Sequence, residues 1–275
     1  MSEQPPLPPP THQVLLDRDG VRIHTFTAPE AFLANSTHVI ETGNALVLVD
    51  SQFVVPYAQA FRAYADGLGK PIERVFLSHG HVDHFFGLGA AFGDVPVHAA
   101  PATIELLERA GESMRADRAK QYGPLVPDRI VLPGHGVVPG VEMIDGVKYE
   151  IEVIADAECE AQLLIALPDF GVAIVQDLVY SGAHVYLTPD TRNWVSVLGR
   201  LADSAFDVFL AGHGPVADRA EVRRNMEYLT FAQRTLAQTA DPDGFKAAML
   251  AAYPDRTGAV LLDICVPRLY GRAGD

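Results

Sequence analysis

Cysteines are scarce in this sequence, and long apolar runs are missing. Only Cys159 and Cys265 occur among 275 residues, which is too few for a disulfide framework and is usual in a reducing compartment. The sequence contains no stretch of about 18 apolar residues, which is the length that would predict a membrane span. The first ten residues are polar and proline-rich, unlike the basic and apolar segments of a secretory signal. We therefore expect a soluble, cytoplasmic protein without a membrane partner.

Basic residues are also few in relation to acidic ones. The chain has 21 Lys and Arg against 35 Asp and Glu, which gives a formal net charge of −14. This charge repels a phosphate backbone and argues against nucleic acid as a partner. We expect a small-molecule substrate instead, and a homo-oligomer remains possible.

The length and the distribution of apolar residues favour one domain. A chain of 275 residues fits one large α/β domain or two small ones, but no linker divides it, and the 48% of hydrophobic residues are spread along its length. We predict that residues 1–12 form a disordered N-terminal tail and that residues 13–275 form a single domain.

Apolar periodicity and turn residues predict strands followed by helices, twice along the chain. The predicted strands are 14–16, 21–26, 37–41, 45–49, 74–77, 95–98, 141–144, 147–154, 162–167, 171–176 and 207–210. The predicted helices are 57–68, 85–92, 102–110, 112–122, 194–201 and 221–238. This order predicts an α/β fold in which two sheets pack face to face with helices outside. The segment 101–125 could be an insertion or lid, and its role stays open.

The run His79-Gly80-His81-Val82-Asp83-His84 concentrates metal ligands directly after an apolar strand. In an extended segment His79, His81 and Asp83 point to one side, and a turn into the next helix brings His84 beside Asp83. Imidazole nitrogen and carboxylate oxygen suit Zn²⁺, and such a cluster can serve two adjacent ions. The alternative is a polar surface loop with Asp83 as a helix cap. It is disfavoured because four ligands packed this closely rarely arise by accident.

This run resembles the H-x-H-x-D-H signature of the metallo-β-lactamase superfamily, and the resemblance extends from about residue 14 to residue 229. The resemblance implies an αββα sandwich of two mixed β-sheets with helices on the outer faces. It also implies that His79 and His81 bind one metal, that Asp83 and His84 bind the other, and that three more ligands follow downstream.

Two of the downstream ligands match the family pattern. Asp177 follows the apolar run 173–175, as the family's bridging aspartate does, although Gln176 stands where Gly is usual. The alternative is that Asp177 is only a turn residue or a helix cap after the strand. His213, in a Gly-His-Gly loop after a strand, should complete the second metal. We predict that the other Gly-His-Gly, around His135, is only a loop between prolines.

The remaining family ligand is usually a His, but no His lies between His135 and His184. Counting back from the strand 161–167 puts Glu158 in its place, and the alkylsulfatase-like branch of the family similarly has Glu there. Glu160 or Cys159 could be the ligand instead, with Glu158 and Glu160 on one strand face, or the ligand could be missing. A Glu adds negative charge, so Mn²⁺ or Fe²⁺ becomes conceivable beside the two Zn²⁺ that we expect.

A dinuclear centre of this kind implies hydrolysis of a small ester, lactone, thioester or sulfate ester. Two metals lower the pKa of shared water to about 7, and Asp83 would be the catalytic residue that orients this water and passes a proton to the leaving group. Five residues between the strands of Asp177 and His213 are candidate substrate contacts, although each is equally explained as a solvated or packing residue. They are His184, Tyr186, Arg192, Asn193 and Trp194.

Two alternative functions remain at this stage. A mononuclear iron oxidoreductase resembling the persulfide dioxygenases of the same fold retains fewer ligands, so the presence of Asp83, His84 and His213 disfavours it. A degenerate member that only binds metal or a partner is supported solely by the loss of the usual third His. Hydrolysis of β-lactams is not favoured, because a cytoplasmic protein would rarely meet the drug.

Overall fold

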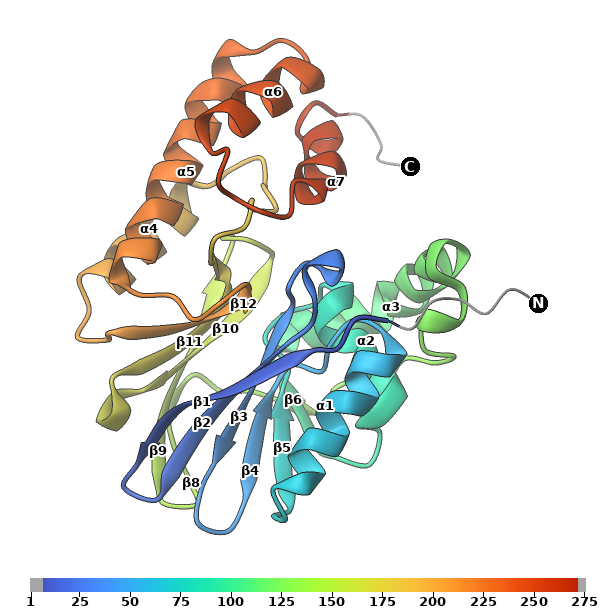
Figure 1. Cartoon of the computed structure of the whole chain (residues 1–275), viewed down its shortest axis with the longest axis vertical. Helices are drawn as coiled ribbons and strands as arrows, with labels where there is room; N and C mark the ends of the chain where they lie inside the picture. Colours follow the sequence, from blue (N-terminus) through green and yellow to red (C-terminus); the bar gives the residue numbers. More distant parts are fainter. Residues whose placement is uncertain (1–6, 272–275) are drawn as a thin grey trace.

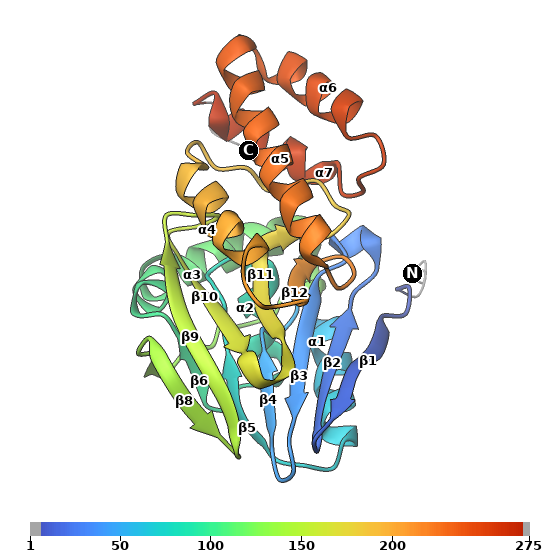
Figure 2. The same cartoon turned by 90° about the vertical axis from the view of Figure 1, so that its left-hand side faces the viewer.

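A computed structural model describes residues 7–271, in which two β-sheets face each other (Figures 1 and 2). The strands of the first sheet, in spatial order, are β1 (Thr11–Arg18), β2 (Val21–Thr27), β3 (Ser36–Glu41), β4 (Leu46–Val49), β5 (Ile72–Phe76), β6 (Val97–Ala99) and β7 (His135–Gly136). Those of the second are β12 (Val208–His213), β11 (Val172–Tyr180), β10 (Ala161–Leu167), β9 (Val147–Ala155) and β8 (Gly140–Ile144). Both sheets mix parallel and antiparallel pairs, as predicted.

Helices cover the outer face of each sheet (Figures 1 and 2). The first sheet packs against α1 (Val55–Gly67), α2 (Val82–Ala91) and α3 (Pro101–Tyr122). The second packs against α4 (Arg192–Ala202) and α5 (Arg219–Gln238), from which α6 (Pro242–Ala252) and α7 (Val260–Leu269) continue beyond the end of the sandwich. The αββα sandwich predicted from the sequence is confirmed. Among residues 7–271, no helix combines the length and apolar character that crossing a membrane requires.

The space between the sheets is an apolar core. Val47 and Phe76 of the first sheet and Leu163, Ile165 and Leu210 of the second are buried there together. Strands β3, β4 and β11 are buried along their whole length, because helices cover the faces that do not look toward the core. This burial holds the two sheets in one fixed arrangement, with the loops at one end of the sandwich close together.

The carboxyl ends of two parallel strand pairs meet at that end. Strand β4 runs parallel to β5, and β11 runs parallel to β12. The chain leaves β4 at Asp50 and reaches His79 shortly after β5. In the second sheet Asp177 lies within β11, and His213 is the last residue of β12. Residues distant in sequence are thereby brought together between the two sheets.

Three predictions about elements need correction. The two helices predicted at 102–110 and 112–122 are one helix, α3, because Gly111 continues the helix where it packs closely against Ile130. Helices α6 and α7 were not predicted. The predicted tail, 1–12, is too long: its first six residues lie outside the described part of the chain, but Thr11 and His12 pair with β2 as the start of β1.

Candidate metal centre

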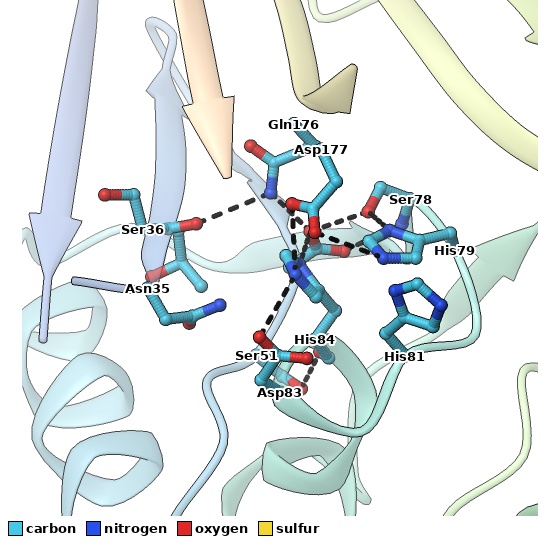
Figure 3. A network of polar contacts seen from close by, with 12 residues as sticks. Asn35, Ser36, Ser51, Ser78, His79, His81, Asp83, His84, Gln176 and Asp177 are labelled. Carbon is cyan, nitrogen blue, oxygen red and sulfur yellow. Dashed lines mark hydrogen bonds and ion pairs between the residues drawn. The ribbon is translucent and has the colours of Figure 1, made fainter. Parts of the chain in front are cut away.

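The histidine run spans the end of the loop that joins β5 to α2 and the first turn of α2; its side chains are drawn in Figure 3. His81 is the residue before α2, and Asp83 and His84 lie in its first turn. Leu106 of α3 packs so close to Gly80 that a Cβ there would lie 2.8 Å from Leu106 Cδ2. The predicted lid segment therefore contributes a helix that packs directly against this loop.

Seven side chains form two sets of possible metal donors, and within each set one atom per residue lies within 4.8 Å of the others. The first set is His79, His81, Glu158 and Asp177, and the second is Asp83, His84 and His213. These are the seven residues predicted as ligands, in the two groups that the family resemblance implied.

Asp177 lies between the two sets. Its Oδ2 atom is 3.7 Å from His79 Nε2 and 3.2 Å from His213 Nε2, and its Oδ1 atom is 3.2 Å from His84 Nε2. This carboxylate therefore contacts imidazoles of both groups, which is the placement required of a residue that bridges two ions.

Glu158 lies in a turn between β9 and β10 and is fully buried. Its Oε1 atom is 3.3 Å from His81 Nδ1, and its Oε2 atom is 3.9 Å from His79 Nε2. Glu160 is exposed, and the Cys159 thiol donates to the Ala161 carbonyl. The expectation that Glu158 and Glu160 share a strand face is wrong, because backbone contacts across residues 156–160 make a turn there instead of a strand.

The absence of a side chain at Gly212 lets Asp177 approach the end of β12, where His213 lies. A Cβ at Gly212 would lie 1.9 Å from Asp177 Oδ1, so no larger residue fits while the carboxylate keeps its position. The Nδ1–H group of His213 donates to the Leu33 carbonyl over 3.0 Å. That hydrogen bond selects the tautomer whose Nε2 lone pair is directed into the site.

Asp50 supports residues of both donor sets but was not predicted from the sequence. Its Oδ2 accepts from His84 Nδ1 and from the Ser78 hydroxyl, both over 2.7 Å, and its Oδ1 accepts from the Ser78 amide. The Ser78 oxygen, 2.9 Å from His79 Nδ1, can then accept from that ring. One buried carboxylate thus orients a histidine of each donor set with Nε2 left free. An acidic residue directly after the apolar run 46–49 was the available signal.

Tyr180 also contacts both sets. Its hydroxyl donates to Asp177 Oδ2 over 2.8 Å and lies 3.3 Å from Glu158 Oε1. Its ring stacks on the His213 ring with centroids 5.0 Å apart and planes at 9°. This tyrosine was not predicted, because its only signal is the position three residues after Asp177.

The unsatisfied atoms of the cluster fit a metal centre. His79 Nε2, His84 Nε2, Glu158 Oε2 and Asp177 Oδ1 are buried without a hydrogen-bond partner among the described residues. Buried polar atoms of this kind are costly unless something binds them. Imidazole nitrogens mixed with carboxylate oxygens are the donors that divalent transition metals accept. The cluster therefore has the composition and the free donor atoms of a dinuclear metal site.

The ionisation of the cluster points the same way. Burial raises the pKa of the Glu158 carboxyl well above its ordinary value. Burial would also raise the pKa of Asp177, but the imidazoles of His84 and His213 lower it well below the usual range. Burial opposes the charge on His84, yet Asp177 and Asp83 raise the pKa of that ring well above 6.5. The buried carboxylates thus require positive charge, which protons or bound cations supply.

The centre opens toward His81 and Asp83. Their side chains are 32% and 14% exposed, whereas those of His79, His84 and Glu158 are fully buried. Tyr186 stands on this open side, with its ring centroid 5.2 Å from that of His81. Its hydroxyl accepts a hydrogen bond from Arg268 of α7. Tyr186 is the one predicted substrate contact that the structure places beside the cluster.

Two other residues predicted as substrate contacts lie in the interior of the protein instead. His184 is buried with its Nδ1 atom 2.9 Å from the Tyr228 hydroxyl. Trp194 is fully buried in the core of the second sheet and donates from Nε1 to the Leu178 carbonyl. Both side chains are used in packing, so they cannot line a substrate pocket.

The two polar residues predicted as substrate contacts, Arg192 and Asn193, face the solvent and a backbone carbonyl. Arg192 is 82% exposed and pairs with Asp190, two residues away. Asn193 donates to the Ala155 carbonyl over 2.7 Å. Neither pairs with a residue of the donor sets, and their assignment to substrate binding stays a prediction.

His135 stays outside both donor sets, as predicted. It is not a loop residue, however, because it pairs with His98 in the short edge strand β7, and the two rings stack with centroids 4.6 Å apart.

Comparison with known proteins agrees with this geometry. The family described as the metallo-beta-lactamase superfamily matches residues 31–213, more than half of the chain. The chain belongs to this superfamily. Its fold and its intact ligand cluster are those of a metallo-β-lactamase-fold hydrolase, and the family and enzyme class predicted from the sequence are confirmed.

Individual relatives of this metallo-β-lactamase-fold protein are distant. An "(R)-specific secondary-alkylsulfatase" from Pseudomonas sp is 26% identical over 209 residues, which are 60% of this chain and 31% of that protein. The chain thus spans about a third of the length of this relative.

Solved structures of the superfamily share the fold at low identity. The metallo-β-lactamase FIM-1 from Pseudomonas aeruginosa, in its mono-zinc form, superimposes with a TM-score of 0.63 at 17% identity, over 82% of this chain and 97% of its own. The metallo-β-lactamase from Erythrobacter litoralis gives a TM-score of 0.59 at 18% identity, over 78% of this chain and 94% of its own.

Proposed function

We propose that this protein uses two divalent metal ions to hydrolyse a small ester, with an alkyl sulfate ester as the favoured class. The observation that carries the proposal is the position of Asp177 between two donor sets that contain all seven predicted ligands. A single-metal oxidoreductase does not need the second set. Zinc is the proposed metal, with Mn²⁺ or Fe²⁺ as alternatives because Glu158 adds negative charge.

Two divalent cations, when bound, supply Lewis acidity and lower the pKa of water to about 7. The chain's own contribution is orientation and proton handling. Asp83 is suited to carry a proton because its carboxylate lies 3.4 Å from His213 Nε2 and its side chain is 14% exposed on the open side of the metal centre. It can hold a proton from water and deliver it to the departing oxygen. Tyr186, beside His81, supplies an aromatic surface where the substrate enters.

Two observations favour a sulfate ester among the possible substrates. The distant relative carries the name of a secondary alkylsulfatase, and Glu158 occupies the position where the alkylsulfatase-like branch similarly has Glu. The reaction would consume one water and convert a sulfate monoester into an alcohol and hydrogen sulfate. The substrate itself is expected to be a small soluble molecule, since no nucleic acid or membrane contact is proposed.

The test is turnover by the zinc-loaded protein on a panel of alkyl sulfates, carboxylic esters, thioesters and lactones. Sulfate release in equal amount to alcohol is expected for at least one alkyl sulfate. Asp83→Asn should reduce turnover by about 100-fold or more, whereas Asp117→Asn on the exposed face of α3 should leave it unchanged. Turnover that survives Asp83→Asn would remove Asp83 from the mechanism.

Metal content separates the hydrolase from its alternatives. We expect two ions per chain by elemental analysis of the loaded protein. One iron per chain together with oxygen consumption would contradict the proposal and favour the oxidoreductase. Two ions without turnover of any ester in the panel would favour a protein that only binds metal.

A further inference from the structure

Gln176, the residue before the bridging Asp177, has an unusual backbone conformation. Its φ is 42°, in the left-handed region that favours glycine, and its side chain is fully buried. A non-glycine residue in that region is strained. The family pattern usually has Gly here, so the sequence keeps a side chain where the backbone favours none.

The buried amide of Gln176, in the second sheet, contacts three residues that lie in or directly after strands of the first; Figure 3 draws its contact with Ser36. Its Oε1 atom lies 2.9 Å from His38 Nε2. Its Nε2 atom donates to Asp50 Oδ2, and a longer contact of 3.4 Å reaches the Ser36 carbonyl. The side chain therefore links β11 to β3 and to the residue that follows β4.

The neighbours of His38 determine the direction of every hydrogen bond in this chain of contacts. His38 Nε2 faces two acceptors, Gln176 Oε1 and the Ala211 carbonyl at 3.3 Å, so it carries the proton. Its Nδ1 then accepts from the Thr25 hydroxyl over 3.0 Å. Burial lowers the pKa of His38 to about 4, so the ring is neutral at ordinary pH. The Gln176 oxygen must accept from His38, which turns its NH₂ group toward Asp50.

This chain of hydrogen bonds ends at Asp50, which also accepts from the metal centre. Asp50 accepts from Gln176 and also from Nδ1 of His84, and Nε2 of the same ring lies 3.2 Å from Asp177 Oδ1. Because Asp50 also accepts from Ser78, which contacts His79 Nδ1, a rotation of Asp50 would disturb a histidine of each donor set. Gln176 is the partner of Asp50 that comes from the opposite sheet.

We propose that Gln176 is a positioning residue of the metal centre: its amide holds the Asp50 carboxylate in the orientation that directs His84 and His79 toward the metals. This function explains why a side chain is kept at a backbone conformation suited to glycine. The proposal rests on the proposed metal site but not on the substrate, and metal-binding readouts test it without turnover.

The experiment uses two variants that separate the amide from the backbone. Gln176→Gly removes the amide and relieves the strained φ, and Gln176→Met removes the hydrogen bonds while it keeps a side chain of similar length. Asp19→Gly is the matched control, because Asp19 also has a positive φ, 55°, but lies in the remote β1–β2 turn. Zinc affinity is measured by competition with a chelator, and the Co²⁺-loaded protein is compared by its visible absorption spectrum.

Both Gln176 variants should bind zinc about 10-fold or more weakly, with an altered Co²⁺ spectrum, while Asp19→Gly matches the parent protein in both measurements. If Gln176→Gly retained the parent affinity and spectrum, the amide would have no positioning role and the proposal would fail. If only Gln176→Gly changed, the backbone and not the amide would be responsible, and the proposal would fail equally.

Discussion

The Nδ1 atom of His84 lies 2.7 Å from Oδ2 of Asp50, and both side chains are fully buried between the sheets. His84 belongs to the second donor set, whereas Asp50 belongs to neither. A carboxylate behind a ligand histidine sets its tautomer and ring orientation. A residue outside both donor sets therefore orients a histidine of the candidate metal centre.

Asp50→Asn tests that relationship. The amide has nearly the same shape but cannot accept hydrogen bonds with both of its groups, so His84 and Ser78 lose part of their support. Zinc affinity should fall by about 10- to 100-fold in a chelator competition. Asp117→Asn serves as the control, because Asp117 is exposed on α3. Equal affinities for the two variants would show that Asp50 does not organise the site.

Gly212→Ala should disrupt the bridging ligand. The new methyl group would lie 1.9 Å from Asp177 Oδ1, so Asp177 or the end of β12 must move. We expect loss of at least one of two bound ions in elemental analysis and a lower thermal midpoint. Gly43→Ala is a matched control, since nothing lies within 4 Å of its Cβ. A Gly212→Ala protein that binds both ions normally would contradict this placement of Asp177.

Tyr180→Phe removes one hydroxyl and keeps the ring that stacks on His213. Asp177 and Glu158 then lose a shared hydrogen-bond donor. We expect zinc to bind about 10-fold more weakly, with little change in protein stability measured after chelation. The interaction with Glu158 is tested by measuring the effect of Tyr180→Phe on zinc affinity in the parent protein and in the Glu158→Gln variant, where the effect should be different. If the effects of the two substitutions on zinc affinity were strictly additive, Tyr180 would not act through Glu158.

The two aromatic residues predicted as substrate contacts should behave differently. Trp194→Ala empties a fully buried position and should lower the free energy of unfolding by about 3–5 kcal/mol. Tyr186→Ala affects a half-buried ring beside His81 and should raise KM with small effects on zinc content and stability. Denaturant unfolding and steady-state kinetics of both variants distinguish the roles. A Trp194→Ala protein of normal stability would contradict its assignment to the core.

Acid should destabilise a buried charge cluster far from the metals. Burial would raise the pKa of Glu41, but hydrogen bonds from Arg22, Lys70 and His24 lower it to about 2. The pKa of Glu41 in the folded protein is thus below its ordinary value of 4.5. The ionised Glu41 therefore stabilises the fold at pH values above 4.5, and this contribution is lost as the pH falls toward 2. Glu41→Gln should flatten this decline in thermal midpoints of the chelated protein between pH 4.5 and 2. Parallel pH profiles for parent and variant would refute the role of Glu41.

The site illustrates which residues a sequence can identify. His79, His81, Asp83 and His84 are adjacent in the chain, so local spacing alone brings them together. Glu158 could be ranked before Glu160 only through family resemblance, because the turn at 156–160 replaces the strand that the pattern favoured. Candidate substrate contacts were chosen by position in the chain, and two of them, His184 and Trp194, were wrong because burial depends on packing that lies outside the segment.

The sequence by itself determined the layered α/β fold, through apolar periodicity and turn residues, and the chemistry of the centre, through a dense run of ligands. Only the tertiary structure decided that Asp50, Tyr180 and Gln176 support those ligands. Their roles depend on hydrogen bonds between separate segments of the chain, from Tyr180 to Glu158, 22 positions away, and from Gln176 to Asp50, 126 positions away. Such contacts leave no local period or spacing in the chain, since they exist only after burial of apolar side chains has brought the two sheets together.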